Sequence, residues 1–174
     1  MSSGVKEVIK DIIIALVIAL VIIQFVRPTV VKETSMEPTL YENNYVFLAK
    51  QAYRFGEPKR GDIIVFKSDI ANEEEGGTKL LIKRIIGLPG DSIKVEDNQV
   101  YLNGKLLNEP YIKEQGDVPG QVDLTVPEGK IFVMGDNRRV SLDSRSPDVG
   151  CVDIDRVVGK AFFRLFPIQD IGRL

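Results

Sequence analysis

Two patterns of apolar residues divide the chain. The first is a run at residues 12–26 that contains no charged side chain and has Gln24 as its only polar one. From residue 45 onward the pattern changes to short apolar runs separated by turn residues. The long run is typical of a helix that is apolar on every face, and the short runs are typical of β-strands.

The apolar run has the composition of a membrane-spanning segment. Its length as a helix is about 22 Å, which is shorter than the hydrocarbon core of about 30 Å. Apolar neighbours on both sides lengthen it, and the flanking Lys10 and Arg27 can extend their charged ends toward the headgroups. We therefore predict a transmembrane anchor over residues 12–27.

Two alternatives to an anchor are weaker. A cleaved signal peptide would end near small residues of A-x-A type, and residues 27–32 offer no such site. A buried core helix would not be apolar on all faces at the end of a chain. Orientation stays open, because Lys6 and Lys10 on one side balance Arg27 and Lys32 on the other.

The rest of the chain predicts a mainly β domain. Asn103-Gly104 predicts a two-residue hairpin turn, since both central positions of a type I′ turn need positive φ. The polar stretches 68–78 and 111–120 are interpreted as loops. The predicted strands lie at 45–50, 62–67, 78–86, 91–96, 99–107, 121–126, 130–135 and 156–166.

Composition excludes several kinds of chemistry. The formal net charge of −2 provides no basic field for nucleic acid, so we expect no nucleic-acid partner. One cysteine and no histidine leave no ligand set for zinc or copper, and we expect no metal or organic cofactor. The lack of histidine also removes the Ser-His-Asp and Cys-His routes to an activated nucleophile.

A serine nucleophile in this chain therefore needs another base, and a neutral lysine is the best substitute. Ser35, in the stretch TSMEPTL, is the candidate nucleophile. Only about one lysine in 2,500 is neutral at pH 7 when solvated, and lowering its pKa to roughly 8 requires about 3 kcal/mol. Burial among apolar groups supplies such a penalty on the ammonium, so the base is expected inside an apolar strand.

Lys83 fits that description best. Period-two alternation in TKLLIKRII places it on the same face as Leu81 and Ile85, and places Arg84 on the opposite face, where we expect water. The competing interpretation is a lysine that protects a strand edge from aggregation, and this run alone does not exclude it.

Four blocks follow the apolar run in order: TSMEPTL at 34–40, RGDIIVF at 60–66, IKRIIGLPGD at 82–91 and MGDNRRVSLDSR at 134–145. In this order they resemble the type I signal peptidases, membrane-anchored serine proteases that remove signal peptides from exported proteins. SMxPT alone is a weak signal, whereas KRxxGxPGD together with GDNRxxSxDSR is specific. The resemblance covers nearly all of residues 12–164.

The resemblance implies a role for several residues. It makes Ser35 the nucleophile and Lys83 the general base, with Ser141 as the hydroxyl that orients the lysine. Asp143 and Arg145 resemble an ion pair that braces this corner of the site. Asp136, Asn137 and Arg138 are interpreted as a turn without a chemical step. The residues that resemble the walls of shallow substrate pockets for small side chains are Val31, Leu40 and Ile82, although each could equally be core.

The chain departs from the family pattern at one position. Some members carry a second oxyanion-hole donor, a serine hydroxyl, two residues before the nucleophile, and here that position is Glu33. An ionised Glu33 would oppose the oxyanion, so we expect its side chain to point away.

Near the other end of the chain, we expect the apolar side chains to fill the core rather than touch lipid; these are Phe162, Phe163, Leu165 and Phe166.

The resemblance also implies a fold, a location and an activity. The fold is a mainly β, partly open barrel of coiled antiparallel sheets with one N-terminal transmembrane helix. Residues 1–11 form a cytoplasmic tail, 12–27 the anchor and 28–174 a catalytic domain outside a bacterial cell membrane. The expected activity is cleavage of N-terminal signal peptides from exported preproteins after small residues of Ala-x-Ala type, so the partners are signal peptides and the lipid bilayer.

Two other functions are considered beside this one. A self-cleaving repressor uses the same Ser/Lys chemistry, but it carries a DNA-binding module and an Ala-Gly or Cys-Gly cleavage site, whereas this chain has an apolar segment and neither dipeptide. A membrane-tethered β-domain that binds peptides without hydrolysis is not excluded by the sequence.

Overall fold

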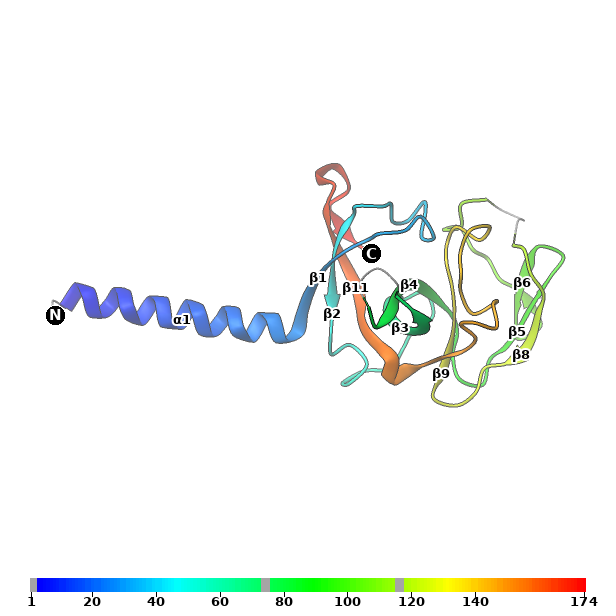
Figure 1. The fold of residues 1–174 in the computed structure, drawn as a ribbon, viewed down its shortest axis with the longest axis horizontal. Coiled ribbons are helices and arrows are strands. Elements are labelled where there is room, and N and C mark those ends of the chain that lie inside the picture. Colours follow the sequence, from blue (N-terminus) through cyan, green and yellow to red (C-terminus); the bar gives the residue numbers. More distant parts are fainter. Residues whose placement is uncertain (1–2, 73–75, 115–117) are drawn as a thin grey trace.

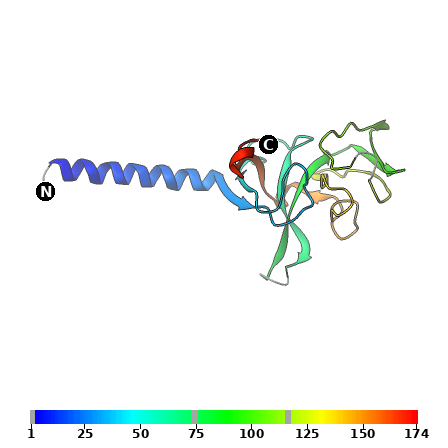
Figure 2. The same ribbon diagram turned by 90° about the horizontal axis from the view of Figure 1, so that it is seen from above.

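The computed structural model describes residues 3–72, 76–114 and 118–174. One long helix, α1 (Ser3–Phe25), projects from a body built of two antiparallel sheets (Figures 1 and 2). Its segment Gly4–Phe25 is long and apolar enough to cross a membrane, and none of that segment is buried against the rest of the chain. The helix begins well before the apolar run at residue 12 and ends at Phe25, because Val26 and Arg27 already belong to a strand.

The larger sheet contains eight strands in the order β1-β2-β11-β3-β4-β9-β10, with β12 paired to β11. It carries α1 at one edge, through β1, and is not closed into a barrel, since β1 and β10 are its two ends. Its strands are β1 (Val26–Val30), β2 (Tyr45–Ala49), β3 (Ile63–Ala71), β4 (Thr78–Gly87), β9 (Lys130–Met134), β10 (Val152–Asp153), β11 (Val157–Phe166) and β12 (Gly172–Arg173).

The smaller sheet has the order β7-β6-β5-β8 and lies at the end of the molecule farthest from α1 (Figure 1). Asn103 (φ 50°) and Gly104 (φ 75°) form the turn between two of its strands, which confirms the predicted hairpin. Its strands are β5 (Ser92–Glu96), β6 (Gln99–Leu102), β7 (Lys105–Leu106) and β8 (Val122–Thr125).

The prediction of a mainly β fold with open antiparallel sheets is confirmed. The loop predicted at 68–78 is partly wrong, because β3 continues to Ala71 and β4 begins at Thr78; residues 73–75 lie outside the described part. In the predicted loop 111–120 the described residues form no strand, and residues 115–117 are not described. Strand β1 was not predicted, since it starts at Val26, the last residue of the apolar run, and contains Pro28, a residue found in sheets mainly on edge strands.

Apolar side chains near the C-terminus do not fill the core as expected. Phe162, Leu165 and Phe166 are 37%, 45% and 46% exposed, and Phe163 is half-buried. They lie on β11 beside β2, where Phe162 stacks on Phe47. Of these side chains, Phe162 lies next to the end of α1, where it lines a hollow together with Phe25 and Val26.

Main-chain contacts fix where α1 leaves the sheet. The Lys50 N–H donates to the Phe25 carbonyl at 2.8 Å, and Lys50 Nζ donates to the Ile23 carbonyl at 3.2 Å. Carbonyl groups in the last turn of a helix otherwise lack partners. Lys50, the residue after β2, thus caps α1 and holds the helix against the larger sheet.

Candidate active site

Ser35 lies in a tight turn that follows β1. Buried Met36 and Leu40 fix this turn to the core, and the Leu40 N–H donates to the Met36 carbonyl at 2.8 Å. The Asn137 N–H donates to the Ser35 carbonyl at 3.0 Å, while Asn137 Nδ2 donates to the Thr34 carbonyl at 3.2 Å. The turn is thereby held from both sides, and the Ser35 side chain is itself buried.

Lys83 lies on β4 with its amine against that serine. Its Nζ is 2.8 Å from Ser35 Oγ, although the two residues are 48 positions apart in the sequence. As predicted, Lys83 is buried on the same face as Leu81 and Ile85, and Ile64 lies directly opposite it on β3. Burial among these side chains lowers the pKa of Lys83 from 10.5 to about 8.

The carboxylate of Asp143 works against that shift but is engaged elsewhere. Its oxygens accept two hydrogen bonds from Arg145, from Nε and Nη2, each at 2.9 Å, and one from the Gly135 N–H at 3.0 Å. Asp143 still raises the pKa of Lys83 and Arg145 lowers it, but the larger effect is burial. The expected ion pair between Asp143 and Arg145 is present.

Ser141 carries a buried hydroxyl without a hydrogen-bond partner, the one such side-chain atom found in the described part of the chain. A Cβ placed on Gly135 would lie 2.3 Å from Ser141 Oγ and 2.5 Å from the Ser35 carbonyl oxygen. The unpaired hydroxyl therefore sits beside the backbone of the nucleophile. No hydrogen bond joins it to Lys83 in this structure, so its orienting role stays a prediction.

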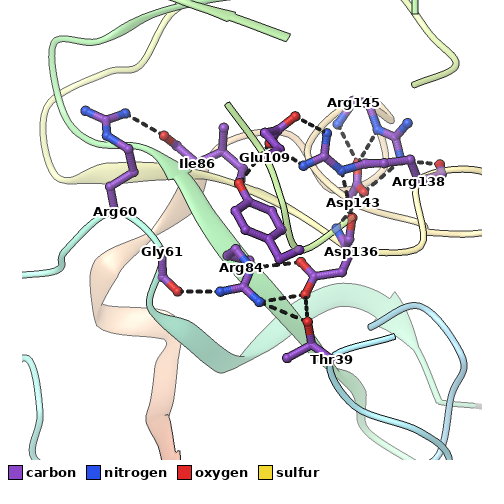
Figure 3. A network of polar contacts seen from close by, with 12 residues as sticks. Thr39, Arg60, Gly61, Arg84, Ile86, Glu109, Asp136, Arg138, Asp143 and Arg145 are labelled. Atoms are coloured by element: carbon purple, nitrogen blue, oxygen red, sulfur yellow. Dashed lines mark hydrogen bonds and ion pairs between the residues drawn. The ribbon is translucent and has the colours of Figure 1, made fainter. Parts of the chain in front are cut away.

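The prediction that Arg84 faces water is wrong. Arg84 binds Asp136 through two hydrogen bonds, Nε–Oδ1 at 2.8 Å and Nη2–Oδ2 at 2.6 Å, and its guanidinium lies 4.1 Å from the centre of the Tyr111 ring. It also donates to Thr39 Oγ1 in the nucleophile turn and to the Gly61 carbonyl (Figure 3). The face opposite Lys83 is thus covered by other parts of the chain.

Three polar residues after β9 lie in a turn, as predicted, and they are buried. The Asp136 carboxylate accepts hydrogen bonds from the Arg84 guanidinium and the Thr39 hydroxyl, and Asn137 donates a hydrogen bond to the backbone of the nucleophile turn. Arg138 forms an ion pair with Glu109, in which both side chains are almost fully buried, and its Nε donates to the Gly135 carbonyl. Figure 3 shows Asp136, Arg138 and Glu109 gathered with Asp143 and Arg145. Sequence reasoning missed their structural importance.

Glu33 forms an ion pair at the mouth of the site. Its Oε1 lies 2.5 Å from Lys79 Nζ, and both side chains are about two-fifths exposed, at 40% and 41%. The carboxylate is therefore paired with another part of the chain, although it remains close enough to raise the pKa of Lys83.

The three predicted pocket residues belong to one apolar cluster. Val31 and Leu40 are buried in it, at 2% and 0% exposure, and Ile82 packs against it while staying partly exposed. In this structure only Ile82 presents surface to a substrate. Their role as pocket walls stays a prediction.

The geometry indicates a class of protein before any comparison is made. A buried serine hydroxyl in contact with a buried amine is an arrangement found in serine hydrolases that work without histidine. The site and fold thus define a serine hydrolase without histidine on an open β scaffold, with one exposed helix long and apolar enough to cross a membrane in the described part of the chain.

Comparisons with known proteins agree. The family model described as "Signal peptidase, peptidase S26" matches residues 5–166, so the chain belongs to this family and is a serine endopeptidase. It is 43% identical over 156 residues to signal peptidase I of Bacillus licheniformis, covering 84% of this chain and 80% of that protein. It is 38% identical over 154 residues to signal peptidase I T of Bacillus subtilis, covering 83% and 76%.

Among solved structures, the chain is similar to a crystal structure of a signal peptidase I from Enterococcus faecalis. The identity is 35%, the TM-score is 0.48, and the match covers 60% of this chain and 97% of that one. The resemblance drawn from the four sequence blocks is confirmed by the family match, which also argues against the repressor and peptide-binding alternatives.

Proposed function

We propose that the protein cleaves N-terminal signal peptides from exported preproteins after small residues of Ala-x-Ala type, with Ser35 as nucleophile and Lys83 as general base. The observation that carries this proposal is the 2.8 Å contact between Lys83 Nζ and Ser35 Oγ in apolar surroundings. A pKa of about 8 leaves an appreciable share of Lys83 neutral near pH 7 to 8.

The reaction follows from this geometry. The Ser35 hydroxyl donates its proton to neutral Nζ while Oγ attacks the scissile carbonyl carbon, and the oxyanion is stabilised by the Ser35 backbone N–H. The Lys83 ammonium then gives that proton to the leaving amine, and the mature protein departs. Lys83 next takes a proton from water, whose oxygen attacks the ester carbonyl. The ammonium then gives this proton to Ser35 Oγ as the bond to the signal peptide breaks, which frees the peptide and restores the hydroxyl and the neutral amine.

Ser141 is suited to hold Lys83 during these steps. Its hydroxyl is buried and unpaired beside the Ser35 backbone, so it is available to accept a hydrogen bond from the amine. A neutral partner orients the lysine without raising its pKa, which a carboxylate in the same position would do.

The substrate is expected to bind as an extended strand. In the described residues β4 pairs with β9 only from Arg84 onward, which leaves Thr78–Ile82 with one edge free of a ladder. A peptide that lies between this edge and the segment before Ser35 would gain main-chain hydrogen bonds whatever its sequence. The aliphatic surface of Ile82, with Val31 and Leu40 packed in the same cluster, would favour small side chains by excluding larger ones.

The membrane is the second proposed partner. Gly4–Phe25 forms a helix of 22 residues, long enough at about 33 Å to cross the hydrocarbon core. We place the anchor in α1, which ends at Phe25, with its N-terminal end on the cytoplasmic side and the body from β1 onward outside a bacterial cell membrane, where cleavage sites emerge. Tethering raises the effective concentration of the enzyme at such sites.

The apolar surface beside α1 supports this placement. Phe25, Val26, Phe55 and Phe162 line a hollow of about 420 Å³ where the helix meets the sheet, and Phe55 is 79% exposed. Replacing Phe55 or Phe162 by Ser should slow cleavage of a preprotein embedded in vesicles but leave cleavage of a soluble peptide unchanged. Leu106→Ser, on the smaller sheet far from α1, is the control.

Hydrolysis itself is tested with the detergent-solubilised full chain and a preprotein whose leader ends in Ala-x-Ala. Ser35→Ala and Lys83→Ala should each abolish release of the mature protein, while Ser146→Ala and Lys94→Ala should retain it. Unchanged cleavage in both of the first two variants would refute the Ser35/Lys83 mechanism. Absence of cleavage by the wild-type chain would favour a domain that only binds peptides.

A further inference from the structure

The ion pair between Glu33 and Lys79 joins the two segments that carry the reacting groups. Glu33 stands two residues before Ser35, and Lys79 stands four residues before Lys83 on β4. Their charged atoms lie 2.5 Å apart. By the alternation of a strand, Lys79 and Lys83 project from the same face of β4. The pair therefore lies at the mouth of the site, on the side from which a peptide would approach.

A carboxylate so close to the nucleophile opposes the proposed reaction in two ways. It repels the negative charge that develops on the substrate oxygen near the Ser35 N–H. It also stabilises the ammonium form of Lys83, which is the form that cannot act as a base. Glu33 does raise the pKa of Lys83, and Lys79 lowers it.

The remaining charges around Lys83 come from the loop after β9 and are already balanced. Asp143 raises the pKa of Lys83 and Arg145 lowers it, and these two side chains are locked together by two hydrogen bonds. The Glu33 and Lys79 pair is the second such balanced pair, but it is solvent-exposed and held by one contact. It is therefore the more easily altered of the two.

We propose that Lys79 is a positioning residue for the reaction: its ammonium holds the Glu33 carboxylate at the rim, turned away from the oxyanion, and cancels its charge there. This inference rests on the Ser35/Lys83 mechanism proposed above. It also explains how this chain accommodates a glutamate two residues before its nucleophile. An exposed ion pair adds little to folding, so its importance lies in the reaction.

The experiment compares Lys79→Met with the wild type in kcat/KM for a soluble peptide substrate across pH. Loss of the ammonium leaves Glu33 uncompensated, so the acidic limb of the profile should move up by about half a pH unit, with a fall of about threefold in kcat/KM at pH 7. The shift should shrink in high salt, because exposed charges are screened. Lys94→Met, which breaks a similar exposed pair with Glu96 on the smaller sheet, is the matched control and should leave the profile unchanged.

Rescue separates this role from a merely structural one. Lys79→Arg should keep the wild-type profile, and Glu33→Gln in the Lys79→Met background should restore it. Glu33→Gln alone should move the acidic limb to lower pH. The midpoint of urea unfolding should stay unchanged in all of these variants, since the pair is exposed.

A Lys79→Met enzyme with a wild-type profile would overturn the inference, as would a shifted profile that Glu33→Gln does not restore. Either result leaves the Ser35/Lys83 mechanism standing, provided that Ser35→Ala is inactive in the same assay. An active Ser35→Ala enzyme would instead overturn the mechanism and the inference together.

Discussion

Lys83 and Arg84 are neighbours on β4, and both side chains are largely buried, yet the surroundings of their charged groups have opposite effects on the charge. Arg84 meets the carboxylate of Asp136 through two hydrogen bonds and lies over the Tyr111 ring. Lys83 meets a serine hydroxyl and aliphatic side chains. The first environment stabilises a permanent cation, and the second favours loss of the charge.

The difference shows how one strand can provide both a general base, Lys83, and a structural ion pair, that of Arg84 with Asp136. Successive side chains point to opposite faces, so adjacent residues enter unrelated surroundings. The carboxylate that raises the pKa of Lys83 most, that of Asp143, is hydrogen-bonded to Arg145 and the Gly135 N–H. Engaging that carboxylate elsewhere is what allows burial to set the pKa of Lys83.

The largest effect is expected from making Lys83 as permanently charged as its neighbour. Lys83→Arg places a guanidinium that cannot deprotonate beside Ser35, so kcat/KM should fall by about a thousandfold or more. The measurement is peptide cleavage at pH 8, with Lys94→Arg as the control. Retention of more than a tenth of wild-type activity would show that a neutral amine is not needed.

Removing the ion pair between Arg84 and Asp136 should affect stability instead. Arg84→Met leaves the buried Asp136 carboxylate without its cation, which should lower the free energy of unfolding by about 3 to 5 kcal/mol. Urea unfolding of the detergent-solubilised chain measures this. Arg156→Met breaks an exposed pair with Asp69 and should change stability by less than about 1 kcal/mol. Equal effects of the two substitutions on the free energy of unfolding would contradict a larger contribution from the buried ion pair than from the exposed one.

Lys83→Met tests the opposite environment through the pH dependence of stability. The folded-state pKa of Lys83 is about 8, below its ordinary value of 10.5, so the unfolded chain binds the extra proton between these two values. Wild-type stability should therefore fall, relative to Lys83→Met, by about 3 kcal/mol as the pH drops from 10.5 to 8, and stay level below. Unfolding curves of the two proteins at several pH values check this, and a constant difference between them would contradict it.

Two serines in one loop give the smallest expected effect. Ser144 Oγ accepts a hydrogen bond from the Val133 N–H at 2.9 Å, whereas Ser141 Oγ is unpaired. Ser144→Ala should therefore lower stability by about 1 to 2 kcal/mol, and Ser141→Ala by less than about 0.5 kcal/mol. For activity the order should reverse, with Ser141→Ala reducing kcat. Measuring both quantities in both variants tests whether the Ser141 hydroxyl serves the reaction.

The sequence predicted the environment of Lys83 better than that of Arg84, for a physical reason. The apolar alternation of β4 is a local pattern, and it correctly placed Lys83 among Leu81 and Ile85. The cover over Arg84 comes from Tyr111 and Asp136, which are distant in the sequence. A local period cannot reveal which distant loop covers the second face of a strand.

The same limit explains the other errors. Strand β1 exists because Val26–Val30 pairs with β2, a contact that nothing in its own composition indicates. Phe162 and Phe166 were expected in the core because aromatic side chains are commonly buried, but both are partly exposed; Phe162 lies beside the end of α1, and Phe166 lies against Tyr45 at the other end of β2. The polar residues after β9 do form the predicted turn, but only their distant partners, Arg84 and Glu109 among them, show that they are buried in ion pairs.

The most direct test of the account is an NMR titration of the Lys83 side chain in the full-length protein labelled with ¹³C at the lysine ε-carbon. The Lys83→Met variant, which lacks this signal, identifies the resonance. The account predicts a transition near pH 8 that coincides with the acidic limb of the kcat/KM profile. A Lys83 amine that stays protonated to pH 10 while the enzyme is active at pH 8 would contradict it.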